Sequence, residues 1–133
     1  MITKLQHSTI YVLDQDSARA FYTEKLGFDV RFDGTFDGFR WLTVWPPHQP
    51  ETDLVLLEPK PPTFDEETAS SLKKIISKGA FGCGVFSTDD CQKTYEELSA
   101  RGVVFLTEPT RQSYGIEATF RDDSGNWFSL SQN

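Results

Sequence analysis

The chain is 133 residues long, about the size of one domain, and its 38% hydrophobic and 25% charged residues are typical of a globular protein. Thirteen Lys and Arg against twenty Asp and Glu give a net charge of −7, which argues against nucleic acid and anionic membrane surfaces as partners. The sequence has no apolar run long enough for a signal peptide or a membrane span, and its two cysteines imply no disulfide framework, so we expect a cytoplasmic protein.

The first half of the chain predicts one helix among four strands. Residues 4–13 are rich in β-branched and aromatic types, which predicts a strand. Asp14 and Asp16 are candidate N-caps of a helix whose apolar residues recur at helical spacing until Gly27 stops it. The stretch 33–38 is typical of a turn. The strands predicted on either side of this turn and after it are 28–33, 38–45 and 53–58.

A proline-rich passage at 59–62 marks the midpoint and predicts a connector. Residues 63–66 match a capping box, which predicts a helix from there to about Lys78, with Gly79 as its stop. The pattern of the first half then returns. The predicted elements are a strand at 81–88, a helix from Asp89 and Asp90 to Ala100 with Gly102 as its stop, and strands at 103–107, 115–121 and 126–131.

The two halves of the sequence align with each other. His7–Asp14 matches Cys83–Asp90, and Leu26–Phe28 matches Arg101–Val103, so the order of one strand, one helix and three strands occurs twice. We therefore predict an α+β fold of two tandem βαβββ modules in one domain that spans 1–133. Its expected parts are module one at 1–59, a helical linker at 60–79 and module two at 80–133.

Three segments carry a family resemblance: 7–30, 84–105 and 114–130. They hold a helix-borne Phe-Tyr pair, a Leu-Gly-Phe and a late Asp-Asp-Ser-Gly-Asn hairpin. Together they resemble the vicinal oxygen chelate superfamily, also called the glyoxalase/bleomycin-resistance/dioxygenase group. The resemblance covers nearly the whole chain and implies a curved mixed sheet around a cleft. It implies less about function, because this fold hosts isomerases, lyases, dioxygenases, thiol transferases and drug-sequestering proteins.

The resemblance also implies four metal-ligand positions, on the first and last strand of each module. His7 occupies the first position, and Leu56, which cannot bind a metal, falls on the second, with Glu58 two residues further along as a substitute. Cys83 falls on the third position and Ser129, a poor ligand, on the fourth. Because one position in four has its usual ligand type, we expect no metal centre of the family kind. A divalent metal held by His7, Glu58 and Cys83 is the alternative.

Aromatic residues make up 14% of the chain and need a core or an apolar cavity. The predicted strand 38–45 carries Phe39, Trp41, Thr43 and Trp45 on one face, and we expect Phe32, Tyr114 and Trp127 nearby. Such a strip suits stacking on a planar or cationic small molecule, whereas any one of these residues could instead pack against the helices. The residues expected to bind the ligand are His7, Trp41, Tyr114, Arg121 and Ser129.

Two functions are therefore predicted. The first is a glyoxalase/bleomycin-resistance-like protein that binds a small organic molecule in an aromatic-lined cleft, with no cofactor. The alternative is a metal-dependent enzyme, either a glyoxalase-type lyase or isomerase or a dioxygenase, with a remodelled ligand set. Nothing in the sequence orients His7 or lowers the pKa of Cys83, so a Cys–His nucleophile pair is not expected. We expect a homodimer, since relatives usually complete their cleft through a two-fold partner.

Overall fold

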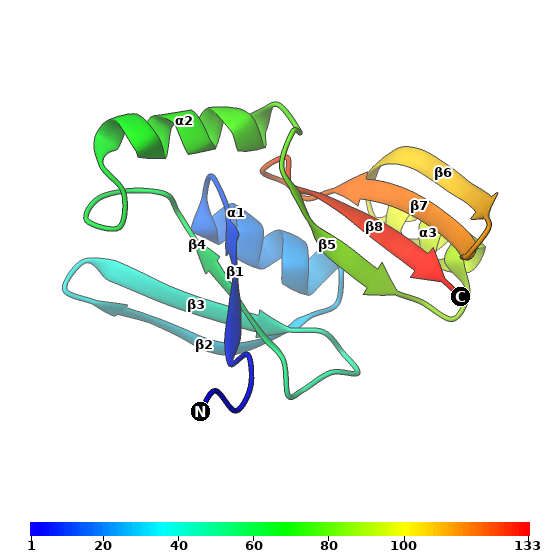
Figure 1. The fold of residues 1–133 in the computed structure, drawn as a ribbon, viewed down its shortest axis with the longest axis horizontal. Helices are drawn as coiled ribbons and strands as arrows, with labels where there is room; N and C mark the ends of the chain where they lie inside the picture. Colours follow the sequence, from blue (N-terminus) through cyan, green and yellow to red (C-terminus); the bar gives the residue numbers. More distant parts are fainter. The chain divides into compact units, whose positions relative to one another are not determined.

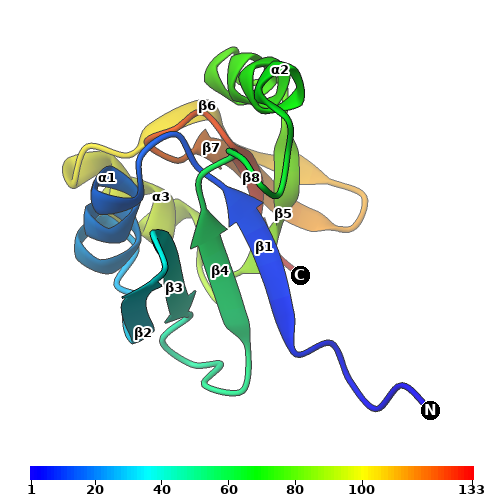
Figure 2. The same ribbon diagram turned by 90° about the vertical axis from the view of Figure 1, so that its left-hand side faces the viewer.

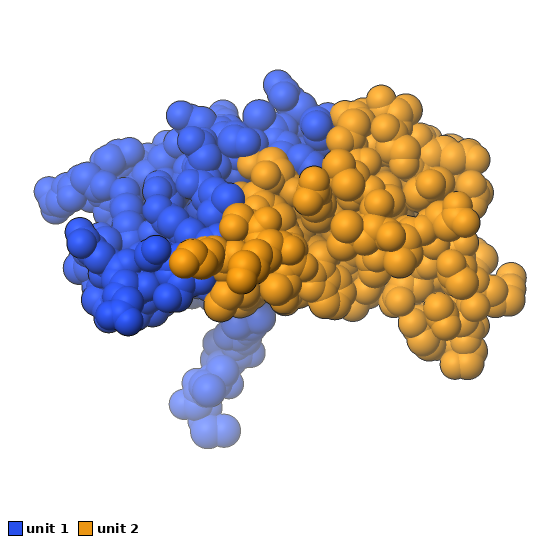
Figure 3. Space-filling model, turned by 90° about the horizontal axis from the view of Figure 1, so that it is seen from above, with its two compact units in different colours: residues 1–73 blue, residues 74–133 orange.

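The computed structural model describes residues 1–133, and these form two compact units, residues 1–73 and 74–133 (Figure 3). The elements of the first unit are β1 (His7–Tyr11), α1 (Gln15–Ala20) with a π-helical turn η1 (Phe21–Lys25), β2 (Asp29–Phe36), β3 (Phe39–Trp45) and β4 (Asp53–Leu57). The helix α2 (Glu66–Ser77) crosses the boundary between the units. The elements of the second unit are β5 (Gly82–Ser87), α3 (Cys91–Ala100), β6 (Val104–Gln112), β7 (Gly115–Arg121) and β8 (Trp127–Gln132) (Figure 1).

Each unit contains one four-stranded mixed sheet. The strand order is β1-β4-β3-β2 in the first unit, where Figure 2 shows the strands side by side, and β5-β8-β7-β6 in the second. In both sheets the first and last strands of the module are parallel neighbours, and the other pairs are antiparallel. The predicted α+β fold of two repeated βαβββ modules is therefore confirmed. None of the helices has the length and apolar character needed to cross a membrane.

Several predicted boundaries are wrong. β1 spans His7–Tyr11 rather than 4–13, and β6 ends at Gln112 rather than at 107. β2 extends to Phe36, and the turn before β3 consists of Asp37 and Gly38 alone, with positive φ angles of 51° and 79°, as a two-residue hairpin requires. The linker helix begins at Glu66 rather than at the predicted capping box, because the carboxylate of Asp65 accepts the backbone N–H of Thr68 at 2.7 Å. Asp65 is thus the N-cap, a role for which Asp is among the preferred residues.

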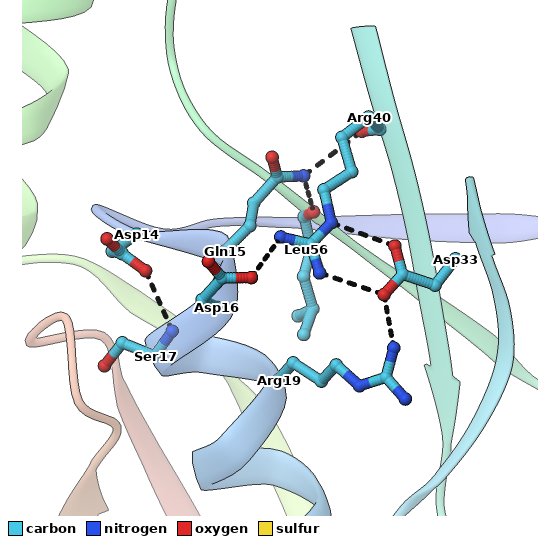
Figure 4. A network of polar contacts seen from close by, with 8 residues as sticks. All are labelled: Asp14, Gln15, Asp16, Ser17, Arg19, Asp33, Arg40 and Leu56. Atoms are coloured by element: carbon cyan, nitrogen blue, oxygen red, sulfur yellow. Dashed lines mark hydrogen bonds and ion pairs between the residues drawn. The ribbon is translucent and has the colours of Figure 1, made fainter. Parts of the chain in front are cut away.

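A polar network fixes α1 on one face of the first sheet (Figure 4). Arg40 of β3 donates two hydrogen bonds of 2.9 Å to the carboxylate of Asp33 on β2 and one of 2.6 Å to Asp16 of α1. Arg19 of α1 also pairs with Asp33. The side-chain amide of Gln15 donates to the backbone carbonyls of Leu56, at 2.8 Å, and of Arg40, at 3.1 Å. Helix α1 is therefore attached to three strands of the sheet through polar contacts as well as through its buried apolar residues.

The second unit packs α3 on one face of its sheet in a similar way. Asp90 caps α3 by accepting the N–H of Lys93 at 3.0 Å, as predicted. Tyr95 of α3 contacts Phe105 of β6 edge to face at 4.7 Å between ring centroids, and Phe86 of β5 stacks on Phe128 of β8 at 4.8 Å. The packed aromatic side chains of this sheet therefore lie on its α3 face, whereas Val85 and Val104, their neighbours along β5 and β6, are exposed on the other.

Candidate ligand-binding site

The first sheet carries its aromatic side chains on the face opposite α1. Successive residues of a strand point to opposite faces, and Leu42 and Val44 of β3 are fully buried on the α1 side. The intervening residues of β3 therefore point to the other face, and Phe32 and Phe36 of β2 join them because they pair with Thr43 and Phe39. We call this surface the aromatic face. It consists of Phe32, Phe36, Phe39, Trp41 and Trp45, with His7 beside them.

Part of the aromatic face is open. The side chains of Phe32 and Phe36 are 43% and 60% exposed, and their rings lie nearly parallel, 5.9 Å apart and 9° from coplanar. Gly34 lies between them on β2, and a Cβ atom there would come within 2.8 Å of the Phe32 ring. Glycine at this position therefore lets the Phe32 ring lie against the strand. A group of exposed aromatic rings on one sheet face is typical of a binding surface.

His7 extends the aromatic face onto β1. Its ring contacts Trp41 edge to face, at 5.6 Å between centroids and 77° between planes, so the structure brings these two predicted site residues together. The parallel register of β1 and β4 pairs His7 with Asp53, and the Nε2 of His7 lies 3.7 Å from the Oδ2 of Asp53. The same register pairs Leu56 with Ile10, three residues from His7 and hence on the opposite, α1 face.

This register corrects the alignment of the second metal-ligand position. Leu56 is fully buried on the α1 side, so it does not share a surface with His7. Glu58 lies beyond the end of β4, and its carboxylate pairs with the ammonium of Lys73 at 3.1 Å. The acidic residue beside His7 is Asp53.

Asp53 belongs to an ion pair that sequence reasoning missed. Arg31 lies at a β-bulge between Val30 and Phe32, and its Nε donates to the Oδ1 of Asp53. Its Nη2 donates to the carbonyl of Pro50, and its guanidinium lies over the Trp45 ring, 5.2 Å from the centroid. One signal could have identified Asp53, since it begins the predicted strand 53–58, which a βαβββ module places parallel to the strand of His7.

The other predicted residues belong to the second unit. Cys83 lies at a β-bulge of β5, and burial, with a smaller contribution from the charge of Asp122, raises the pKa of its thiol to about 12. The thiol is therefore protonated at neutral pH and is neither a nucleophile nor a ready metal ligand. Ser129 of β8 is buried, pairs with Thr119 and Val85, and points away from α3.

Arg121 and Tyr114 lie at opposite ends of β7, so they do not form one site. Arg121 pairs with Trp127 of β8, and the ring of Trp127 lies across Gly82, where a Cβ atom would come within 2.4 Å of it. Tyr114 is 56% exposed in the turn before β7, and a hydrogen bond to Glu117 raises the pKa of its phenol.

The residues present do not fit a metal centre of the family kind. Within each unit, no three or more His, Cys, Asp and Glu side chains gather in a way that could hold a metal ion. His7 and Asp53 of the first unit are two donors, and the carboxylate of Asp53 is already paired with Arg31. In the second unit the two predicted ligand positions hold the thiol of Cys83 and the buried hydroxyl of Ser129. Catalytic metal sites usually have at least three protein ligands.

Comparisons with known proteins agree with this architecture. A family model described as the Glyoxalase/Bleomycin resistance protein/Dioxygenase superfamily matches residues 4–130. The uncharacterized protein YurT of Bacillus subtilis is 39% identical over 97% of this chain and 98% of its own length. The crystal structure of UcmS2 is 53% identical, with a TM-score of 0.95 over the whole of both chains. TnmS3, an antibiotic binding protein from Streptomyces sp. CB03234, is 30% identical, with a TM-score of 0.77 over 98% of this chain and 96% of its own.

Proposed function

The chain belongs to the glyoxalase/bleomycin resistance protein/dioxygenase superfamily, and we propose that it is a binding protein for a small organic molecule. The ligand is a planar, antibiotic-like compound that stacks on the aromatic face and is bound without the metal of the family enzymes. The similarity to TnmS3, an antibiotic binding protein, supports this choice among the functions of the superfamily.

The observation that carries the proposal is the aromatic face itself. Aromatic side chains bury large areas and gain further from offset or edge-to-face stacking, so several of them on one face favour a planar ligand. Trp41 is held in place by its edge contact with His7, while Phe32 and Phe36 remain open. A ring system that is fixed before the ligand arrives loses little conformational entropy on binding.

The donor set supports a metal-free site. The acidic residue beside His7 is Asp53, whose carboxylate is already paired with Arg31, and the family's fourth ligand position falls on Ser129. The hydroxyl of Ser129 is not among the carboxylate and imidazole ligands that a divalent ion prefers. The lyase, isomerase and dioxygenase reactions of the superfamily therefore have less support here than ligand binding.

Tryptophan fluorescence tests the proposed binding. Titration with a panel of planar aromatic compounds should quench the emission saturably, and Trp41→Ala should weaken binding at least tenfold, as is typical of a buried aromatic anchor. Leu106→Ala is a matched control, because Leu106 is an equally apolar residue, 51% exposed, in the second unit. Equal losses in the two variants would contradict the location of the site.

Metal analysis tests the metal-free site separately. Protein purified without chelator should contain less than one equivalent of any divalent metal. Stoichiometric metal that disappears in His7→Ala would contradict the proposal and favour the enzyme.

We further propose a homodimer, since an isologous pair is the commonest oligomer and relatives commonly complete their cleft in this way. Light scattering at micromolar concentration should give twice the monomer mass of 15.1 kDa. The monomer mass would contradict this assembly.

A further inference from the structure

A charged cluster lies at the end of the first sheet where β3 ends and where β1 and β4 begin. It consists of Arg31, Asp53 and His7, and it adjoins the aromatic face through Trp41 and Trp45. We propose that this cluster makes the site selective for planar ligands that carry an anionic oxygen substituent, such as a ring carboxylate, with Arg31 as the recognition residue. This inference rests on the proposed binding function and adds the chemical class of the ligand.

Arg31 is held ready for such a group. Its Nε and Nη2 donate to Asp53 and Pro50, and the Trp45 ring lies beneath its guanidinium, so the side chain is fixed in three ways. A guanidinium has five N–H donors, and those of Nη1 have no partner in the protein. The side chain is 41% exposed. A fixed planar guanidinium with free donors suits a carboxylate, because little rotational freedom is lost when the hydrogen bonds form.

The other ion-paired cations of the first unit pair with carboxylates outside the charged cluster. Arg19 and Arg40 pair with Asp33 on the α1 face, and Lys73 pairs with Glu58. Among the ion-paired cations of the first unit, Arg31 is the one that borders the aromatic face, with His7 as a second donor. Since the chain has a net charge of −7, a preference for an anion has to come from local contacts rather than from the field of the whole protein.

Asp53 is a positioning residue in this arrangement. Its carboxylate is 18% exposed and lies between Arg31 and His7, so it orients both groups and offsets part of the charge of Arg31. An anionic ligand that binds Arg31 is repelled by this carboxylate. Removal of the Asp53 charge should therefore strengthen the preference for an anion, and removal of the Arg31 charge should abolish it.

Two probes with the same ring test the inference: naphthalene-2-carboxylate and naphthalene-2-carboxamide. The wild-type protein should bind the carboxylate about tenfold more tightly at neutral pH, as expected for a charge-assisted hydrogen bond at a partly exposed site. Arg31→Met should weaken binding of the carboxylate and bring the two affinities to within about twofold of each other. Asp53→Asn should increase the carboxylate preference. Arg111→Met, which removes an exposed charge in the second unit, should leave the preference unchanged.

The outcomes separate this inference from the proposed function. If neither probe binds the wild type, the binding function and the inference are both contradicted. If both probes bind the wild type equally, the binding function stands and selectivity for an anion is refuted. If Arg31→Met loses both probes, Asp53→Asn decides: a stronger carboxylate preference supports the recognition role of Arg31, and an unchanged preference refutes it.

Discussion

The ion pairs between α1 and the first sheet should make folding stability depend on pH. Arg40 holds Asp33 through two hydrogen bonds of 2.9 Å, and these bonds are the main reason that the pKa of Asp33 lies below its ordinary value. The side chains of Arg40 and Asp33 are 23% and 18% exposed. Asp33→Asn removes the negative charge of this side chain and keeps its shape, so it weakens the hydrogen bonds that Arg40 makes with it.

The expected cost of Asp33→Asn is about 2 kcal/mol at neutral pH. A charge-assisted hydrogen bond contributes about 1.5–3 kcal/mol to stability. Because solvent reaches this pair, we expect its two bonds together to contribute near the low end of that range. Asp16→Asn is a matched control, because Asp16 bonds the same Arg40 but is 88% exposed. An exposed pair of this kind contributes at most about 1 kcal/mol.

The sign of the pH dependence follows from the direction of the shift. A carboxyl whose pKa is lowered by folding contributes its full stability above the pKa of the unfolded chain, and this contribution is lost as the pH falls through the folded pKa. The difference between wild type and Asp33→Asn should therefore be largest near neutrality and should shrink as the pH falls below the ordinary pKa of an aspartate.

Urea denaturation at several pH values measures this difference as a change in the free energy of unfolding at constant m-value. Equal losses for Asp16→Asn and Asp33→Asn would refute the assignment of the stability to the partly buried pair. A deficit of Asp33→Asn that stays constant down to pH 2.5 would refute its electrostatic origin.

Two further predictions concern the second unit. Gly125→Ala should lower the free energy of unfolding by about 3 kcal/mol or more, because φ is +116° and the new Cβ would come within 2.2 Å of the carbonyl oxygen of Ile76. Gly27→Ala is the control: φ is +75° and the space around it is open, so it should lower the free energy of unfolding by about 1 kcal/mol. Equal losses of stability in thermal denaturation would contradict this reasoning. Cys83 should react with a disulfide reagent more slowly than free glutathione at neutral pH and faster as the pH rises, because burial raises the pKa of its thiol to about 12; rapid labelling near pH 7 would contradict the burial argument.

The repeated module was predictable because its signals are local. Asp14 and Asp90 cap the first helix of each module, and Gly27 and Gly102 follow with positive φ angles of 75° and 91°. Each of these features depends on a few neighbouring residues. The start of α2 was missed because the predicted capping box begins at Thr63, whereas the carboxylate of Asp65 accepts the capping hydrogen bond.

The candidate site was predicted only in part, because its geometry depends on residues far apart in the chain. The sequence predicts that His7 and Trp41 belong to one site, and the structure brings their rings into contact. The partner of His7 on β4 depends on the register of two strands that lie forty or so residues apart, and an alignment that counts along one strand cannot supply it. For that reason the alignment selected Leu56, whereas the register places Asp53 beside His7.

The bulge at Arg31 explains why β2 contributes to the aromatic face. Val30 pairs with Val44 on the α1 face, so strict alternation would also direct Phe32 towards α1 and Asp33 away from it. One extra residue in the strand reverses this order: Phe32 pairs with Thr43 on the aromatic face, and Asp33 turns towards Arg40. The same residue that sets this reversal places its guanidinium over Trp45 and beside Asp53. The β2 residues of the aromatic face, the position of Arg31 in the charged cluster and the contact of Asp33 with Arg40 therefore depend on one bulge, which no periodicity in the sequence reveals.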